Sequence, residues 1–309
     1  MKVWCLIGLM LFSVALAARG DIDEEIRIRL EGVDPRTIKS VPREHPRVRN
    51  SQVDCLKTVN RLKNGPADIP DVLSKGDKYT DSTFWEDDMI CQQNGGKWQN
   101  QQWCENTFGN ISSGIKFYRR INDVMSGLSL FPSDGNPQFD NAIQGTAGTC
   151  YIMSAMSSCA ERPDLIKNVF LNSQTNSAGI YGFDFCIRGK KWTIDIDDNM
   201  LYYYPIQPQL VFASTDKERT VVWPALLEKA FAKVKGSYDM SDGGFVETGL
   251  RTLLCAPVES YRSATDITNT AEADAMWQYL KDAEDSGYIL GAGTVGTSSN
   301  QYNNVCGIT

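Results

Sequence analysis

Histidine is almost absent from this sequence, and basic residues do not predominate. The 309 residues contain one histidine, His45, and 31 lysines and arginines against 38 aspartates and glutamates, for a net charge of −7. Nucleic-acid-binding proteins usually carry a basic patch, so this balance argues against a nucleic-acid partner. No two cysteines have C-x-x-C spacing. With a single histidine, this excludes the common zinc-binding patterns, and we expect no metal site.

Long apolar runs are also missing, except at the N-terminus. Lys2 precedes an apolar run over residues 4–16, and residues 15–17 read A-L-A, the small-x-small pattern of a cleavage site. The pattern predicts a secretory signal peptide over residues 1–17, with an uncleaved signal anchor as the alternative. No later run is long enough to cross a bilayer. We therefore expect a secreted product with no membrane partner after signal cleavage.

If the protein is secreted, its nine cysteines become informative about disulfide bonds. Cys5 would leave with the signal peptide, and in an oxidising compartment most of the other eight should form disulfides. If Cys150 stays free, seven remain, which is an odd number. Either one more thiol is free, or its partner lies beyond Thr309. The other cysteines are Cys55, Cys91, Cys104, Cys159, Cys186, Cys255 and Cys306.

Two regions precede the strongest signals. Residues 18–50 are rich in mixed charge and then in proline and arginine, so they bury little apolar surface. We interpret them as a charged leader or pro-segment, and a solvated leader without a role is the alternative. Residues 51–135 form an N-terminal region that contains cysteines and tryptophans. Its aromatic residues are better explained as core than as a ligand site.

From residue 136 onward, helix and strand patterns alternate. A buried helix is expected from about Cys150, and residues 181–187 and 192–196 alternate as two strands of a hairpin around the turn at 188–191. A helix should begin at Pro224 and end at Gly236. A last helix is expected over 272–283 and a strand over 288–292. The class is α+β.

Cys150 is the candidate nucleophile. A cysteine attacks as the thiolate, and a helix N-terminus lowers its pKa because unpaired N–H groups present partial positive charge there. Gln144 precedes Cys150 by six residues, with Gly145 and Gly148 between them. Flexible glycines would let the loop fold back so that the glutamine amide reaches the thiol and stabilises an oxyanion. A structural cysteine at a helix start is the alternative.

Several motifs together resemble the calpain family of cysteine proteases. Residues 144–151 are similar to the nucleophile loop Q-G-x-x-G-D-C-W, and 136–139 read N-P-Q-F as in that family. Residues 223–233 read W-P-A-L-L-E-K-A-F-A-K, similar to W-x-A-L-L-E-K-A-Y-A-K. Shorter matches, in order along the chain, lie at 178–181, 196–198, 236–238 and 242–244.

The resemblance implies a papain-like thiol protease core of two subdomains over residues 136–309. Cys150 would attack a peptide carbonyl, and Gln144 would donate to the oxyanion. Gly243 and Gly244 match the glycines of an S-G-G motif and would bind substrate backbone, with a plain Gly-Gly turn as the alternative. The implied function is that of a calpain-like cysteine endopeptidase, with protein or peptide substrates. The helical nucleophile half would be present, and the second, β-rich half truncated.

The chain also departs from the family pattern. The family's base is a histidine followed later by an asparagine, and residues 306–309 are similar to the run just before that histidine. His45 lies in the charged leader, so we expect the 309-residue chain to be inactive or nearly so. The family suggests calcium as a cofactor. At two positions expected to carry acidic ligands, however, the chain has Asn141 and Val221, which argues against that site.

Three other readings remain open. A secreted, non-catalytic binding or scaffold protein could retain the protease fold. Another enzyme, such as an acyl transferase on a papain-like core, is disfavoured by the match at 223–233. A small disulfide-framework binding protein is disfavoured by the extended helix and strand patterns.

Overall fold

A computed structural model describes residues 10–14, 66–91, 100–203, 209–213, 220–262 and 269–294. Helices and strands mix along the chain, which confirms the α+β class; the expected two-subdomain arrangement and the truncated second half stay predictions. The helices are α4 (Ile69–Lys75), α5 (Glu86–Ile90), α6 (Gln101–Ser112), α7 (Ile121–Val124), α8 (Cys150–Ala160), α9 (Pro163–Lys167), α10 (Trp223–Lys235), α11 (Val246–Leu254) and α13 (Thr270–Asp285), with 3-10 turns η2 (Phe139–Asn141) and η3 (Asp239–Ser241).

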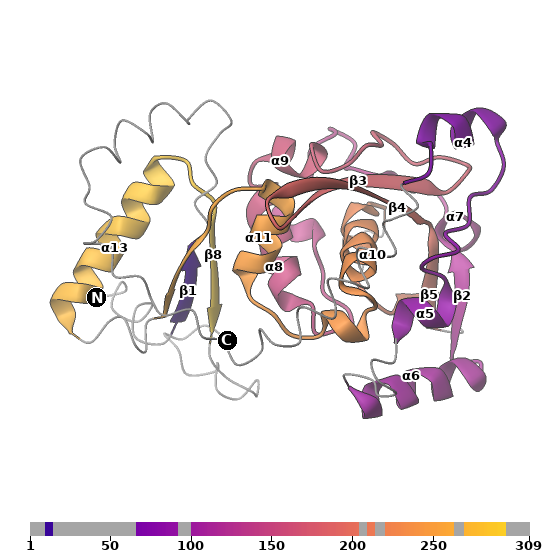
Figure 1. Ribbon diagram of the computed structural model, residues 1–309, viewed down its shortest axis with the longest axis horizontal. Helices are drawn as coiled ribbons and strands as arrows, with labels where there is room; N and C mark the ends of the chain where they lie inside the picture. The colour runs from indigo at the N-terminus through magenta and orange to yellow at the C-terminus, as the bar shows by residue number, and fades with distance from the viewer. Residues whose placement is uncertain are drawn as a thin grey trace.

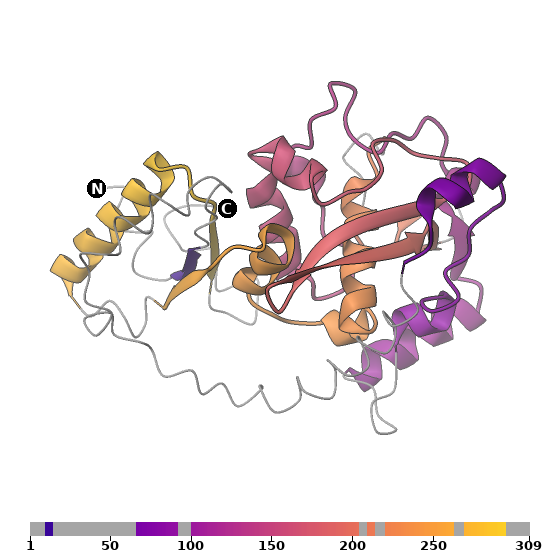
Figure 2. The ribbon, with the colours of Figure 1, turned by 45° about the horizontal axis from the view of Figure 1, so that its top comes forward.

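Within the described ranges, the strands form three small sheets. One has the order β2-β5-β6, a second is the β3-β4 hairpin, and the third has the order β7-β1-β8. Their bounds are β1 (Met10–Val14), β2 (Lys116–Arg120), β3 (Ile180–Ile187), β4 (Lys190–Asp197), β5 (Asn199–Tyr203), β6 (Gln209–Leu210), β7 (Glu259–Arg262) and β8 (Leu290–Thr294). In Figures 1 and 2, α13 and the β7-β1-β8 sheet lie at one end of the molecule, and α8 and α11 lie between that end and the hairpin.

The hairpin confirms the pattern seen in the sequence. Tyr181 lies opposite Ile196, and Phe183 lies opposite Ile194, as the alternation requires. Arg188 and Gly189 both have positive φ, 54° and 75°. Two central residues of this kind make the tight turn whose twist matches a right-twisted strand pair. The hairpin therefore closes on two residues and covers the main core.

Helix α8 runs through that main core. Ile152, Ala155, Met156 and Cys159 are fully buried, and they pack in one cluster with the hairpin residues Phe183 and Phe185, with Trp223 of α10 and with Leu250 of α11. The burial of apolar side chains is the dominant favourable term in folding. The helix that begins with Cys150 is thus held along its length by three neighbouring elements.

Helix α10 begins one residue before the expected Pro224 and ends at Gly236, whose φ is 121°. The sequence pattern predicts one apolar face, but every residue from Trp223 to Lys233 is buried. Lys229 Nζ lies 2.6 Å from Asp197 Oδ1, and Lys233 Nζ lies 2.8 Å from Asp81 Oδ2. Buried charges are tolerated when they are paired and hydrogen-bonded, and these two lysines meet that condition.

The β7-β1-β8 sheet involves the expected signal peptide. Met10–Val14 is its central strand and pairs antiparallel with both neighbours. Signal cleavage would remove this strand, and that cleavage stays a prediction. The last helix is confirmed, while the strand expected at 288–292 is found two residues later, as β8. Within the described ranges, no helix has both the length and the apolar character needed to cross a membrane.

Among the described residues, four cysteines form two disulfides. Cys91 pairs with Cys104, and Cys186 pairs with Cys255. Among the described cysteines Cys150 and Cys159 are free, the first exposed and the second buried. Cys159 thus agrees with the expectation of one further free thiol besides the nucleophile. Cys55 and Cys306 lie outside the described residues.

Candidate active site

Cys150 is the first residue of helix α8, and its side chain is exposed. Thr149 is the N-cap, and its carbonyl accepts hydrogen bonds from the N–H groups of Ile152 and Met153. The thiol therefore lies at the end of an 11-residue helix where backbone N–H groups lack helical partners. Cys159 of the same helix is buried, and this burial raises the pKa of its thiol to about 12.

The loop before Cys150 is fixed against the segment that follows β6. Thr146 donates to the carbonyl of Val211 from both its backbone nitrogen and its hydroxyl, at 2.9 and 3.0 Å. A Cβ on Gly145 would lie 2.1 Å from the carbonyl oxygen of Phe212. Only glycine permits so close an approach of two backbones. The glycine thus serves to dock the nucleophile loop.

Gln144 lies in the same loop, but its hydrogen bond is local. Its Nε2 donates to the carbonyl of Ala147 at 2.8 Å. A carboxamide nitrogen carries two hydrogens, so this bond leaves a second donor on Gln144 for another acceptor. The geometry thus keeps Gln144 in the loop of Cys150, and its role as oxyanion donor stays a prediction.

Gly243 and Gly244 lie against the nucleophile loop. The N–H of Gly243 donates to the carbonyl of Gly148 at 2.9 Å, and both glycines are exposed. A Cβ on Gly244 would lie 2.6 Å from the ring of Tyr151, which leaves no room for a side chain there. The hydroxyl of Tyr151 donates to the carbonyl of Ser241 at 3.0 Å. Gly243 and Gly244, distant in sequence from Cys150, are thereby brought against its loop, and both are exposed.

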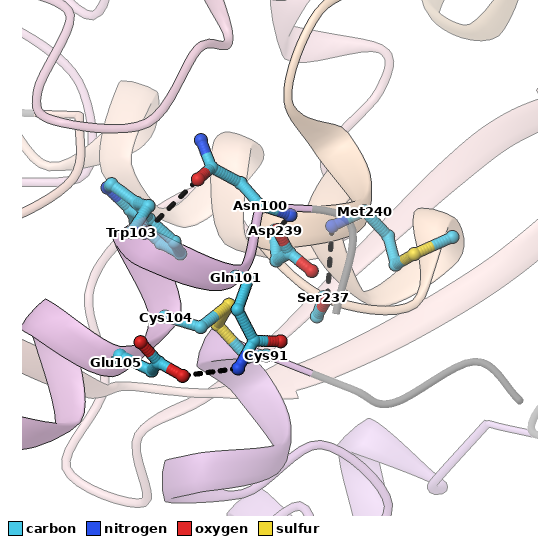
Figure 3. Close-up of a disulfide and its surroundings, with 9 residues drawn as sticks. All are labelled: Cys91, Asn100, Gln101, Trp103, Cys104, Glu105, Ser237, Asp239 and Met240. Carbon is cyan, nitrogen blue, oxygen red and sulfur yellow. Dashed lines mark hydrogen bonds between the residues drawn. A yellow bond between two sulfur atoms is a disulfide. The ribbon is translucent and has the colours of Figure 1, made fainter. Parts of the chain in front are cut away.

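A disulfide braces the turn that leads into these glycines. Figure 3 shows the Cys91–Cys104 disulfide joining α5 to α6 close to η3. The backbone N–H of Asn100 donates to the carboxylate of Asp239 at 2.7 Å, and the N–H of Met240 donates to the hydroxyl of Ser237 (Figure 3). The helices before residue 113 therefore support the turn from which Asp242, Gly243 and Gly244 follow.

Glu228 is a site residue that the sequence patterns did not single out. It is fully buried in α10, and its carboxylate accepts from the hydroxyl of Thr149 at 2.5 Å and from the N–H of Ala213 at 2.7 Å. Burial raises the pKa of this carboxyl to about 7, although the two hydrogen bonds lower it in part. Glu228 connects α10, the segment after β6 and the residue before Cys150. Its only sequence signal is an acidic residue inside an apolar helix.

The two positions suggested for calcium do not fit that ion. The side-chain oxygen of Asn141 accepts from the N–H of Gln138 and from Nε1 of Trp223, at 2.9 and 3.0 Å. Val221 is buried and apolar. Calcium needs six to eight oxygen ligands, and neither side chain offers it a free one. His45, the only histidine, lies outside the described residues.

Comparisons with known proteins identify related sequences. A model of the calpain family of cysteine proteases matches residues 100–308. The chain is 32% identical over 167 residues to a protein of Arabidopsis thaliana named calpain-type cysteine protease DEK1, covering 53% of this chain and 7% of that protein. It is also 32% identical over 182 residues to the human calpain-1 catalytic subunit, covering 58% of this chain and 24% of that subunit. The chain thus spans less than a quarter of the length of these relatives.

Proposed function

Because this chain belongs to the calpain family of cysteine proteases, we propose that it is the nucleophile-bearing part of a cysteine endopeptidase acting on proteins or peptides. The observation that carries the proposal is the exposed Cys150 at the start of α8, with the exposed backbone of Gly243 bonded to its loop. A nucleophile at a helix N-terminus beside unhindered backbone is the arrangement that attack on a bound peptide requires.

Each residue has a distinct part in the proposed reaction. The Cys150 thiolate attacks the scissile carbonyl carbon, and an S–C bond forms while the carbonyl oxygen gains negative charge. The backbone N–H of Cys150 and the second N–H of Gln144 stabilise that charge. The C–N bond then breaks, the leaving amine takes a proton, and water later releases the acyl group. Gly243 and Gly244 hold the substrate backbone close to the loop.

A positioned base is needed for two of these steps. It must take the thiol proton, and it must protonate the leaving amine. The single histidine, His45, lies in the charged leader about a hundred residues before Cys150. We therefore propose that the 309-residue chain hydrolyses peptides very slowly by itself. A chain that continued into a Gly-His stretch and a later asparagine would supply the base and the group that orients it.

Two measurements test the proposal. Iodoacetamide should alkylate Cys150 much faster than Cys159, as read from the masses of the two cysteine-bearing peptides. Casein hydrolysis should be far slower with the 309-residue chain than with a chain extended through the histidine and asparagine, and Cys150→Ser should abolish turnover in the extended chain. Equal turnover by the two chains would contradict the need for that base. Failure of Cys150 to react faster than an exposed cysteine in a short peptide would contradict its role as nucleophile.

A non-catalytic binding protein is the second candidate. Two features favour it, namely the single histidine and Asp242 in place of the family's serine. A binding protein that merely retains the fold would show ordinary thiol reactivity at Cys150, so the alkylation rate separates the two candidates.

Secretion is a further part of the proposal. Its support is the apolar N-terminal run and the two cysteine pairs, because disulfides persist in oxidising compartments. Residues 18–50 would follow as a leader or pro-segment. Expression in secretory cells and N-terminal sequencing of the product test both points. A first residue near Ala18 would establish signal cleavage and remove the pro-segment, and an intact Met1 would contradict cleavage.

A further inference from the structure

Asp242 places a carboxylate at the edge of the nucleophile loop. A Cβ on Gly148 would lie 1.7 Å from Asp242 Oδ1, so this oxygen lies directly against the Cα of Gly148. Consecutive Cα atoms are about 3.8 Å apart, so Gly148 lies within about 8 Å of Cys150. The carboxylate of Asp242 thus lies against the nucleophile loop, at a residue two positions before Cys150.

The same residue begins the glycine turn. Asp242 follows η3, and its backbone leads into Gly243, whose N–H is bonded to the Gly148 carbonyl. Asp242 is partly exposed, and both glycines are exposed. A peptide that pairs with the backbone of Gly243 and Gly244 therefore passes the carboxylate.

We propose that Asp242 is a specificity-determining residue that selects a lysine or arginine side chain in the substrate residue bound at Gly243 and Gly244. The proposal rests on the proposed function for its substrate, and on the position of Asp242 for its charge. A carboxylate at a partly desolvated edge attracts a cationic group over several ångströms. It repels an acidic side chain to a similar degree.

Small charged thiol reagents test the charge without requiring proteolysis. The trimethylammonium-ethyl and sulfonato-ethyl methanethiosulfonates both convert an exposed thiolate to a mixed disulfide and release methanesulfinate. Their rate constants at Cys150 are read from the mass of its peptide. We expect the ratio of cationic to anionic rates to fall about three- to tenfold in Asp242→Asn, and to fall in 0.5 M salt for the wild type.

Asp274→Asn is the matched control, because it removes the same charge from an exposed position on α13. Its ratio should equal that of the wild type. An unchanged ratio in Asp242→Asn, or an equal fall in Asp274→Asn, would overturn the proposal. Thermal unfolding of each variant verifies that the fold is retained, and Asp242→Ser, which carries the family's residue, serves as a second variant if Asp242→Asn does not fold.

Peptidyl chloromethyl ketones test the substrate class. Two labels are compared that differ only in arginine or norleucine at the residue before the reacting one. The arginine label should modify Cys150 faster in the wild type, and the preference should fall severalfold in Asp242→Ser. A norleucine preference in both proteins would overturn the selection of basic side chains. If neither label outpaces iodoacetamide, the protease function fails, while the ratio of the charged reagents still reports on Asp242.

Discussion

Helix α10 carries buried charge on two sides, and the two sides are stabilised differently. Lys229 and Lys233 are paired with aspartates from β4 and from the segment before α5. Glu228 is held by the hydroxyl of Thr149 and the N–H of Ala213, and no ion pair to it is found among the described residues. The side with the two lysines connects α10 to β4 and to the segment before α5. The side with Glu228 has no cation and contacts Thr149, the residue that precedes Cys150. A buried carboxyl that has hydrogen bonds but no cationic partner can change its protonation state with pH. Glu228 is such a group, and it lies beside the residue that precedes the candidate nucleophile.

The largest effect should come from breaking the paired side. Lys229→Met leaves the buried Asp197 without its cation, so the free energy of unfolding should fall by about 3–5 kcal/mol. Urea denaturation measures it. The exposed pair Lys281–Asp285 is the matched comparison, and Lys281→Met should cost far less, because water and salt screen an exposed pair. A similar small loss at Lys229 would show that its pairing contributes little.

Glu228, on the side of α10 without a cation, should determine part of the pH dependence of the free energy of unfolding. The carboxyl of Glu228 has a pKa raised by burial to about 7, above its ordinary value of 4.5. Below the ordinary value its contribution to stability is fully present. It is lost as pH rises from about 4.5 through about 7, because over this range the unfolded chain has released a proton that the folded state still retains. In Glu228→Gln this loss should disappear, since the amide stays neutral.

The two proteins should thus have similar stability at pH 5, and the variant should be the more stable by about 2–3 kcal/mol at pH 8. Tyr151 and Tyr238 lie nearby, but burial raises the pKa of both hydroxyls, so they stay neutral over this range. Urea denaturation at the two pH values provides the measurement. A constant difference between the proteins would contradict the raised pKa.

The docking of the nucleophile loop should show the next largest effect. Gly145→Ala places a Cβ against the backbone of Phe212, which cannot move aside as a side chain could. Overpacking of this kind costs about 1–3 kcal/mol, and the alkylation rate of Cys150 should change with it. Gly109→Ala in α6 is the control, since no atom lies within 4 Å of its Cβ position. That variant should be neutral or slightly stabilised, and a neutral Gly145→Ala would show that the loop is loosely held.

Local features could be predicted from the sequence, while the two sides of α10 could not. The hairpin and the ends of α10 follow from alternation, a positive-φ turn and a terminal glycine, which act within a few residues. The partners of Glu228 and Lys229 lie 79 and 32 residues away. Propensity and periodicity carry no information on such contacts. The positions of Gly243 and Gly244 beside Cys150 came only from the family resemblance.

The apolar run at the N-terminus shows the same limit of prediction from the sequence. Its composition is typical of a signal peptide, and in the structure of the whole chain Met10–Val14 pairs with β7 and β8, about 250 residues later. A short apolar segment suits either a signal h-region or a strand, because both need only apolar side chains in sequence. Composition alone cannot choose between them.

The smallest effect should come from Thr149. It distinguishes the role of the hydroxyl of Thr149 from the role of the residue as the N-cap of α8. Thr149 makes no side-chain capping bond to α8, so its hydroxyl acts on Glu228 and not on the helix end. Thr149→Val removes a donor to the carboxylate. The loss of stability should therefore be about 1 kcal/mol greater at pH 8, where Glu228 is ionised, than at pH 5, where it is neutral. Thr149→Ser keeps the hydroxyl and should match the wild type at both values. A loss in Thr149→Val that is the same at both pH values would mean that packing at position 149 matters and the charge of Glu228 does not, and the contrast between the two sides of α10 would then lose its link to Cys150.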